Sequence, residues 1–463
     1  MDKPSLHHSI ARVTTAASFG FALVQLDVTI VNVALPRMAV DLHMGVAGLQ
    51  WVVDAYALSF AALLLSLGYL GDRLGARRIF LGGMVLFALA SVLCGCATHA
   101  LLLIVGRALQ GIGAAAMLPC SLALLSHATA HGHALRARAV GWWTASGSIA
   151  IAAGPIIGGL LMSVTTWRSI FFVNVPVCAV GIWLALRVPE SELKTSHGRF
   201  DLPGQLLAIL ALTGLTMAVI EIHPLGWTHP LVLACMAVVF ASVPLFLLVE
   251  SRSAAPMLPL RFFKAPGFST AVIYGIVVNM TYYGVVFLLS LYLQRVHGYS
   301  ALRTGLAYLP LTATFFGVNV FSGWLVGRIG ARWPMVLGAL IDGAGFTLFL
   351  FLGASSPYLL MLPAFALLPA GMGLGVPAMT TTVLSAVEKG ASGTASGVLN
   401  AARQAAGAIG VALFGALTGD RNELIVSGLH RSAIISVVLL LIAAMLAFLY
   451  ISTGRRPESL RPK

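Results

Sequence analysis

Long apolar runs follow one another along almost the whole chain, separated by short segments that carry charge, proline or glycine. A helix needs ~20 mostly apolar residues to cross a bilayer, and the runs are long enough to do so. The pattern therefore predicts fourteen membrane-spanning helices. They are expected near residues 14–36, 49–70, 79–97, 101–125, 140–162, 169–187, 204–224, 229–250, 267–292, 303–326, 334–353, 358–384, 397–418 and 432–453.

The composition also indicates a membrane protein. Of the 463 residues, 59% are hydrophobic and only 9% are charged, whereas soluble domains carry roughly 25% charged residues. The net charge of +13 is spread over the short gaps between apolar runs rather than over one polar face, so no nucleic-acid partner is expected. We predict an all-α integral membrane protein surrounded by lipid.

Lys and Arg are distributed unevenly over the gaps. With the N-terminus inside, 20 of the 28 fall on the inner side, six on the outer side and two inside spans. Cytoplasmic loops of membrane proteins carry an excess of these residues. Both termini are therefore predicted to be cytoplasmic, in a multi-pass membrane protein.

One loop sequence occurs twice. GYLGDRLGAR at 68–77 returns 255 residues later as GWLVGRIGAR at 323–332, with six of ten positions identical. The first copy joins spans 2 and 3 and the second joins spans 10 and 11, which predicts two six-helix halves with two helices inserted between them. We expect an N-terminal bundle at 1–190, an inserted pair with polar linkers at 191–265, and a C-terminal bundle at 266–463.

Charged residues inside the N-terminal spans are the first candidates for a functional site, and two of them stand out. Asp27 is near the middle of span 1, where a charged side chain costs at least ~2.5 kcal/mol on insertion scales, so we expect a functional residue that lines the cavity. A hydrogen-bonded structural role is the alternative. Arg107 in span 4 needs a partner for its charge, and a clamp on backbone carbonyls is the alternative to a functional role.

Four further charged residues are candidates for the cavity or the proton path. Asp54 lies about one turn into span 2, and Asp342 lies in the middle of span 11. Glu221 is close to the outer end of span 7, where its carboxylate can also reach the membrane surface. Arg403, in span 13, is a candidate partner for one of these acids.

Five segments, in order along the chain, resemble signatures of the major facilitator superfamily. LDVTIVNVALP at 26–36 resembles the span-1 signature, and LIVGRALQGIGAA at 103–115 resembles the span-4 signature. GSIAIAAGPIIGG at 147–159 resembles the span-5 antiporter signature, and ASGVLNAARQAAGAIG at 395–410 resembles span 13. The loop GYLGDRLGARR at 68–78 supplies the fifth segment, with Gly68, Asp72, Arg73, Gly75, Arg77 and Arg78.

Within the superfamily, the chain resembles the fourteen-spanner drug:proton antiporters of the EmrB/QacA type, and residues 51–78 resemble exporters of the methylenomycin-resistance type. The resemblance implies that Arg107 modulates proton coupling near Asp27. It also implies that Asp72 docks against the start of span 13 when the cytoplasmic side is closed. Such a contact suits a carboxylate, which is favoured at a helix N-terminus by ~0.3–1 kcal/mol. The second copy of the loop has Gly327 in place of this acid.

The span-5 segment leaves one helix flank nearly without side chains, through Gly147, Gly154, Pro155, Gly158 and Gly159. The resemblance associates this motif with export rather than uptake. Close packing against a neighbouring helix explains the glycines equally well. The direction of transport therefore depends on the resemblance.

These observations predict proton-coupled efflux of lipophilic, cationic drugs or antibiotic-like compounds by alternating access. A transporter for one specific solute, such as an amino acid, siderophore, sugar or other metabolite, including uptake, is the alternative. No enzyme, metal site or cofactor is expected, because the spans contain no nucleophile–base set or phosphate loop, and the proton gradient is the expected energy source. The expected oligomeric state is a monomer, which binds and transports a small molecule and protons. Nothing in the sequence requires the adaptor partner that EmrB-like systems can use.

Overall fold

The computed structural model describes residues 3–129, 133–188, 201–253, 256–388, 391–419 and 421–452. The predicted boundary between the N-terminal bundle and the inserted pair, at 190 and 191, lies outside these residues. The same holds for several of the basic residues that predict the topology, which fall in 189–200, 389–390 and 453–463.

The first part of the chain forms seven helices, followed by two more. They are α1 (Lys3–Asp41), α2 (Val46–Leu74), α3 (Ala76–Gly95), α4 (Ala100–Ala128), α5 (His133–Val164), α6 (Ser169–Phe172) and α7 (Asn174–Leu186), then α8 (Leu202–Leu225) and α9 (Pro230–Arg252). The short α6 and α7 together occupy the sixth predicted span. Helices α8 and α9 occupy the two spans of the predicted insertion.

The rest of the chain begins with a 3-10 turn, η1 (Leu260–Lys264). The helices that follow are α10 (Pro266–Leu291) with its π-helical end η2 (Tyr292–Val296), α11 (Ala301–Ala307), α12 (Leu309–Ile329), α13 (Arg332–Phe349), α14 (Tyr358–Ser385), α15 (Ser392–Ala416) and α16 (Asn422–Tyr450). Helix α16 begins ten residues before the predicted span at 432–453. Charged residues mark the membrane boundary, and the helix continues past it.

Among the described residues, twelve helical segments are long and apolar enough to cross a membrane. Helices α13 and α15 coincide with the two other predicted spans and each carries a charged residue in its interior, Asp342 and Arg403. Both lie within the bundle, because α13 packs on α14 and α16, and α15 packs on α2, α8 and α10. The chain is therefore a multi-pass membrane protein.

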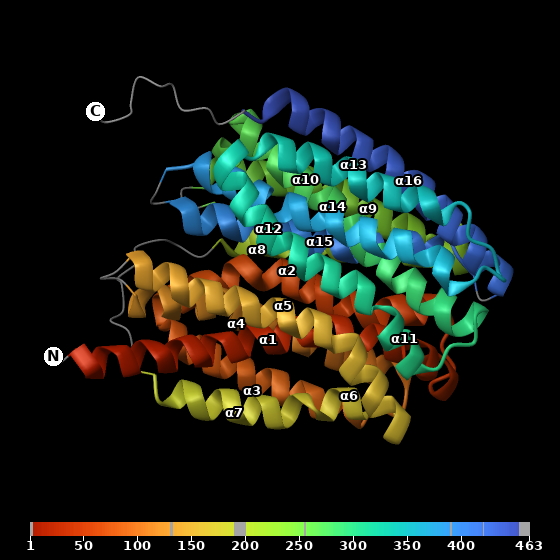
Figure 1. Cartoon of the computed structure of the whole chain (residues 1–463), viewed down its shortest axis with the longest axis horizontal. Helices are drawn as coiled ribbons and strands as arrows, with labels where there is room; N and C mark the ends of the chain where they lie inside the picture. The colour runs from red at the N-terminus through yellow and green to blue at the C-terminus, as the bar shows by residue number, and fades with distance from the viewer. Residues whose placement is uncertain are drawn as a thin grey trace.

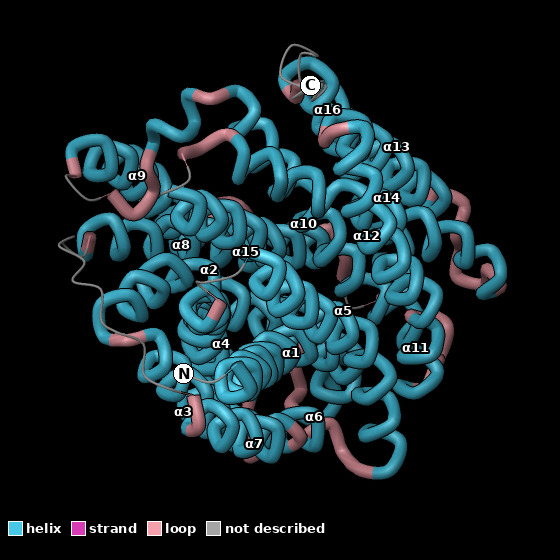
Figure 2. Tube along the Cα trace, turned by 60° about the vertical axis from the view of Figure 1, so that its left-hand side comes forward, coloured by secondary structure: helices cyan, strands magenta, loops and turns pink. Residues whose placement is uncertain are grey.

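The two parts of the chain repeat one packing scheme. In the first, α1 packs on α4, α5 and α7, and α4 also packs on α2 and α3, while α3 packs on α7. In the second, α10 packs on α14, α15 and α16, and α14 also packs on α12 and α13, while α13 packs on α16. We call these groups the N-half and the C-half. Helix α8 packs against α2 of the N-half and α15 of the C-half, and α9 lies outside it at the periphery (Figure 2).

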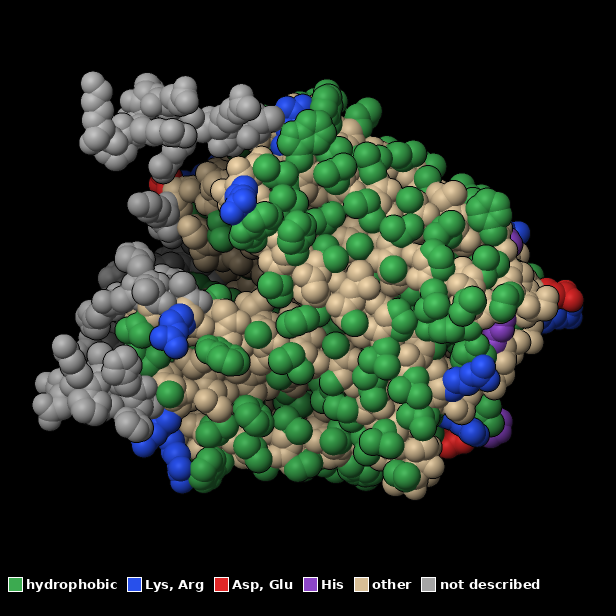
Figure 3. Space-filling model, in the orientation of Figure 1, with side chains coloured by type: hydrophobic (Ala, Val, Ile, Leu, Met, Phe, Trp, Pro, Cys, Tyr) green, Lys and Arg blue, Asp and Glu red, His purple; other side chains and the backbone are tan. Residues whose placement is uncertain are grey.

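The helices run roughly alongside one another, and α1 begins at the same end of the bundle as α16 ends (Figure 1). We call this the terminal end and the opposite one the distal end. In Figure 3 the charged side chains lie toward the two ends, and the band between them is free of charge. That distribution suits a molecule whose middle is surrounded by hydrocarbon.

Each copy of the duplicated loop ends its helix with a glycine of positive φ. Helix α2 is followed by Gly75, with φ 102°, and α12 by Gly330, with φ 79°, a region that favours glycine. The N–H of each glycine donates to a carbonyl four residues earlier, that of Gly71 or Val326, at 3.0 Å. The repeated sequence thus ends two corresponding helices at the terminal end.

The arginine that closes each copy of the loop contacts the last helix of its own half. Arg77 donates from Nε to the Ala185 carbonyl at 3.1 Å and from Nη2 to the Leu186 carbonyl at 2.6 Å. These carbonyls belong to the C-terminal turn of α7, where a cation is favoured. Arg332 places its guanidinium carbon 4.3 Å from the centre of the Phe448 ring on α16.

Candidate functional site

An ion pair is buried inside the N-half. Arg107 on α4 donates from Nη1 to Oδ2 of Asp27 on α1 at 2.5 Å, and the two side chains are 1% and 0% exposed. The same arginine donates from Nε to the Val52 carbonyl of α2 at 3.0 Å, and its guanidinium carbon lies 4.5 Å from the centre of the Tyr56 ring. The cation therefore has a partner on each side.

Amide and hydroxyl groups complete the surroundings of Asp27. Its Oδ1 accepts from Nδ2 of Asn174 on α7 at 3.0 Å and from Nε2 of Gln110 on α4 at 3.4 Å. The Gln110 carbonyl oxygen accepts from Nη1 of Arg107 at 2.8 Å, and its amide donates to Ser91 Oγ on α3 at 2.7 Å. A single carboxylate is thus connected to all five of α1, α2, α3, α4 and α7.

Small residues on α4 allow this network to form. A Cβ at Gly106 would lie 2.6 Å from Cys94 Sγ of α3, and one at Gly111 would collide with the Tyr56 carbonyl of α2. Small residues let membrane helices approach closely. Helices α2 and α3 therefore come near enough for the long side chains of Arg107 and Gln110 to bridge them.

The network compensates two opposite charges that are shielded from water. A buried carboxylate is stable in its charged form only while a cation and hydrogen-bond donors surround it. Arg107 has the Val52 carbonyl and the Tyr56 ring as further partners. The sequence had suggested that Asp27 lines the cavity. The structure instead places it in the interior of the N-half, where α3, α4 and α7 enclose it.

The other predicted acids are not part of this network. Asp54 on α2 is fully buried, and both of its carboxylate oxygens lack a hydrogen-bond partner among the described residues. Asp342 on α13 is 2% exposed, and its Oδ2 also lacks a hydrogen-bond partner among the described residues. Glu221 on α8 accepts from Trp51 Nε1 on α2 at 3.2 Å, which attaches the inserted pair to the N-half.

Arg403 forms no ion pair with Asp54, Asp342 or Glu221. No salt bridge within 4.0 Å joins it to an acid among the described residues, and its Nε has no hydrogen-bond partner there. Its side chain instead packs on α10, where a Cβ at Gly275 would lie 3.4 Å from Arg403 Cγ. It is a cation of the C-half that faces α10.

The remaining residues of the first loop lie around the terminal end of α2 and α3. Asp72, Arg73 and Arg78 are exposed. A Cβ at Gly68 would lie 3.3 Å from Pro119 Cβ of α4, so this glycine sets the distance between α2 and α4.

The glycines of the span-5 segment serve two different contacts. A Cβ at Gly147, Gly154 or Gly158 would collide with Phe21, Thr29 or Ile30, respectively, all on α1. A Cβ at Gly159 would instead lie 2.7 Å from the Leu302 Cα of α11, in the C-half. The Pro155 carbonyl contacts α11 as well, at Gly305. One motif therefore packs α5 within its half and also across to the other half.

Polar side chains join the two halves near the distal end. Gln50 at the start of α2 donates from Nε2 to the Ala412 and Val411 carbonyls of α15, at 2.6 and 3.2 Å. Gln294 donates to the Val33 carbonyl of α1 at 2.9 Å, and Ser290 donates to the Asn32 carbonyl. At the terminal end, the surface is hollowed between the halves (Figure 3). Polar contacts thus join the halves distally, and the surface between them is recessed at the terminal end.

Sequence reasoning missed several members of the site. Gln110 stands three residues after Arg107 and hence on the same face of α4, so helical spacing could have identified it. Asn174, Ser91 and Gln50 are ordinary polar residues in apolar helices, and nothing in the sequence indicates which distant residues they contact.

The buried ion pair inside one half, the two halves with the same packing scheme and the many membrane helices define a multi-pass membrane transporter. The chain belongs to the Major Facilitator Superfamily, whose family model matches residues 17–411. The fold is shared with a solved structure of the nucleoside transporter NupG, at a TM-score of 0.68 and 10% identity over 96% of this chain and 100% of that one. A bacterial homologue of the human lysosomal transporter Spinster, in an inward-facing and unoccupied conformation, gives 0.65 at 18% identity, over 97% and 98%.

Two relatives are similar in sequence over most of their length. The Methylenomycin A resistance protein of Bacillus subtilis is 36% identical over 406 residues, which cover 88% of this chain and 87% of that protein. The multidrug resistance protein Stp of Mycobacterium tuberculosis is 38% identical over 402 residues, which cover 87% and 74%.

Proposed function

We propose that this protein exports lipophilic, cationic drugs or antibiotic-like compounds in exchange for protons, by alternating access between the N-half and the C-half. The observation that carries the proposal is the Asp27–Arg107 pair, buried at the junction of five helices. A carboxylate in that position is costly to insert and is expected to have a function. The names of the two relatives, which refer to antibiotic and multidrug resistance, support export as the direction.

In the proposed cycle, Asp27 exchanges a proton when Arg107 or a substrate cation changes its distance from the carboxylate. Protonation removes one charge of the pair, so the cation is left with its other partners, the Gln110 side-chain oxygen on α4 and the Val52 carbonyl and Tyr56 ring on α2. Helix α2 also carries Gln50 of the distal contact. A change at the carboxylate can therefore bias the contact between the halves.

The proposal includes fourteen spans in two six-helix bundles with the α8–α9 pair inserted, and a terminal end that faces the cytoplasm of a bacterial cell. On this assignment the open recess faces inward, and Asp72 docks on the start of α15 in the opposite, outward-facing state. Asp54 and Asp342 are the further carboxyl groups that we propose for proton binding, since both are buried and have carboxylate oxygens without a hydrogen-bond partner in the part of the chain that the structure describes.

The test is drug transport in everted membrane vesicles energised by respiration, compared between the wild type and Asp27→Asn. Asp41→Asn is the matched control, because Asp41 is 45% exposed and forms a longer pair of 3.5 Å with Arg168. We expect Asp27→Asn to abolish uncoupler-sensitive drug uptake into the vesicles and Asp41→Asn to retain most of it. Normal coupled transport by Asp27→Asn would refute the proton assignment, and greater drug accumulation by intact cells with the protein would refute export.

A further inference from the structure

A groove of about 740 Å³ runs along the N-half between α1 and α5, with Val177 of α7 in its lining. It is separate from the surface between the halves, because every residue that lines it belongs to the N-half. Trp142 and Ile149 on its rim are 67% and 59% exposed, so the groove is open to the surroundings of the molecule. In the membrane-embedded part of the chain, those surroundings are lipid.

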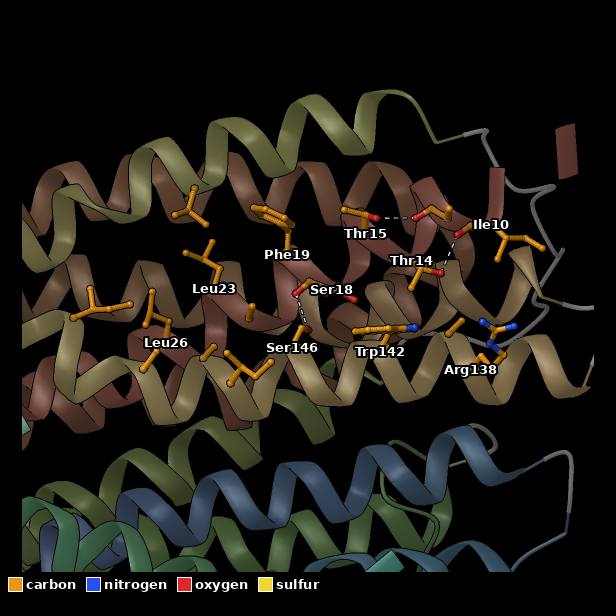
Figure 4. A pocket seen from close by; sticks show the side chains of 18 of the residues that line it. Ile10, Thr14, Thr15, Ser18, Phe19, Leu23, Leu26, Arg138, Trp142 and Ser146 are labelled. Carbon is orange, nitrogen blue, oxygen red and sulfur yellow. Dashed lines mark hydrogen bonds between the residues drawn. The ribbon is translucent and has the colours of Figure 1, made fainter. Parts of the chain in front are cut away.

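The lining changes in character along the groove (Figure 4). Arg138 and Trp142 of α5 lie toward the terminal end, together with the hydroxyl groups of Thr14 and Thr15 on α1. Deeper in the membrane the lining becomes apolar, with residues such as Leu26 and Ile157. Ser146, whose hydroxyl donates to the Ser18 carbonyl at 3.2 Å, lies between the two regions. The groove therefore has a polar, cationic end and an apolar end.

Its length corresponds to one leaflet of a bilayer. The lining residues of α1 extend from Ile10 to Leu26, and this interval rises about 24 Å along a helix at 1.5 Å per residue. Half of a bilayer with its headgroups is about 20–22 Å thick. A phospholipid has the same order of groups over the same distance, with a charged headgroup at the surface and acyl chains toward the midplane.

The charge of the groove selects among lipids. Arg138 lies on the rim, and none of the described residues that line the groove is acidic. A guanidinium binds a phosphate through charge-assisted hydrogen bonds, and tryptophan is favoured at the headgroup level. A headgroup with net negative charge meets no opposing carboxylate here.

We propose that this groove is a binding site for one anionic phospholipid of the leaflet at the terminal end, with the phosphate at Arg138 and an acyl chain between α1 and α5. The site does not depend on the transport function. Helix α5 also supplies Gly159 and Pro155 to the contact with α11. A lipid bound between α1 and α5 would therefore restrict the position of α5, the helix that contacts the other half distally.

Native mass spectrometry of the purified full-length protein tests the site directly. The protein is titrated with phosphatidylglycerol or with phosphatidylcholine of the same acyl chains. Arg138→Gln removes the cation, and Ala153→Trp fills the apolar part of the groove. Arg252→Gln is the matched charge control, because Arg252 is exposed at the end of α9. Gly317→Trp is the bulk control, because nothing lies within 4 Å of a Cβ there.

We expect the wild type to retain one phosphatidylglycerol in preference to phosphatidylcholine. Arg138→Gln should weaken phosphatidylglycerol binding about fivefold, the factor expected for one basic residue at an anionic headgroup. It should weaken phosphatidylcholine binding less, because the choline cation offsets the charge of that phosphate. Ala153→Trp should weaken both, while the two controls bind as the wild type does. Equal retention of both lipids by the wild type and Arg138→Gln would overturn the proposal. Displacement of the bound lipid by a transported drug would also overturn it, since the groove would then belong to the substrate path.

Discussion

Arg107 and Asp27 are 80 residues apart in sequence, and their side chains meet at 2.5 Å inside the N-half, where neither is more than 1% exposed. The guanidinium also reaches the Val52 carbonyl and lies against the Tyr56 ring. Its Nη1 donates to the Gln110 side-chain oxygen as well. This arrangement uses the planar shape of arginine as well as its charge, because the guanidinium serves four partners in different directions.

Arg107→Lys is therefore expected to impair transport although the charge is conserved. A compact ammonium group can keep Asp27, but it loses the Val52 carbonyl or the Tyr56 ring. We expect a fall of at least about tenfold in the initial rate of drug transport in vesicles, as for loss of about 1.4 kcal/mol. Arg168→Lys is the control, because the Arg168–Asp41 pair is partly exposed, and it should change the rate less than about twofold.

Removing one member of the buried pair should also destabilise the protein. Arg107→Gln leaves the Asp27 carboxylate without its cation, which costs about 3–5 kcal/mol for a buried pair. The double variant Asp27→Asn with Arg107→Gln should recover most of the thermal stability in detergent and none of the coupled transport. A double variant that is less stable than Arg107→Gln would contradict the account of the pair.

Gly159→Leu is expected to prevent closure of the distal end. A Cβ at this position would lie 2.7 Å from the Leu302 Cα and 2.8 Å from the Ala301 carbonyl oxygen, both backbone atoms that cannot move aside independently. In a Cys96→Ser background, a cysteine at Gln294 should then react faster with a membrane-impermeant maleimide added from the distal side. Gly141→Leu on the same helix has open space around it and should react as the parent does.

Gln50→Ala should shift the conformational equilibrium without a steric clash. The variant removes two hydrogen bonds to α15 carbonyls, each with a net contribution of about 0.5–1.5 kcal/mol. We expect the population closed at the distal end to fall by about tenfold relative to the open one. Distances between spin labels on α5 and α11 would measure the shift, and an unchanged distribution would mean that Gln50 does not hold this contact.

Asp72→Asn is expected to abolish most transport while the protein still inserts, because the proposed contact with α15 needs a charge. Gly327→Asp, at the corresponding position of the second loop, should give no gain. A steric clash would not confound the Gly327→Asp variant, since no atom of the described residues lies within 4 Å of a Cβ at Gly327 and the new side chain has room. Efflux assays with immunodetection of the membrane protein provide the measurement. Full activity of Asp72→Asn would reduce the loop to a topological signal.

The helices could be predicted from the sequence because bilayer thickness controls the length of each apolar run. The runs at 204–224 and 229–250 became α8 and α9 within two residues at each end. Boundaries failed where a helix leaves the membrane: α1 extends beyond the predicted 14–36 at both ends, to Lys3 and Asp41. Hydropathy cannot register those extensions, because polar residues continue a helix in water.

The site could be predicted only in part. Asp27 and Arg107 stood out because each charge is costly in hydrocarbon, and their pairing agrees with the expected proximity. Arg403 shows the limit of that reasoning. Its charge was as conspicuous as that of Arg107, yet its neighbours are on α10 and not one of the acids. Which partner a buried charge reaches depends on helix rotation and depth, and single-residue composition carries no information about either.

The two copies of the repeated loop share one structural role, and the first copy has a second role in addition. Each copy stops its helix with a left-handed glycine and places an arginine on the last helix of its own half, Arg77 on α7 and Arg332 on α16. These features tie each loop to the half in which it lies. Only the first copy also carries an acid at its exposed surface. A chimera with both loops of the second type should therefore fold into two intact halves. It should lose the proposed contact by which the N-half responds to the position of the C-half.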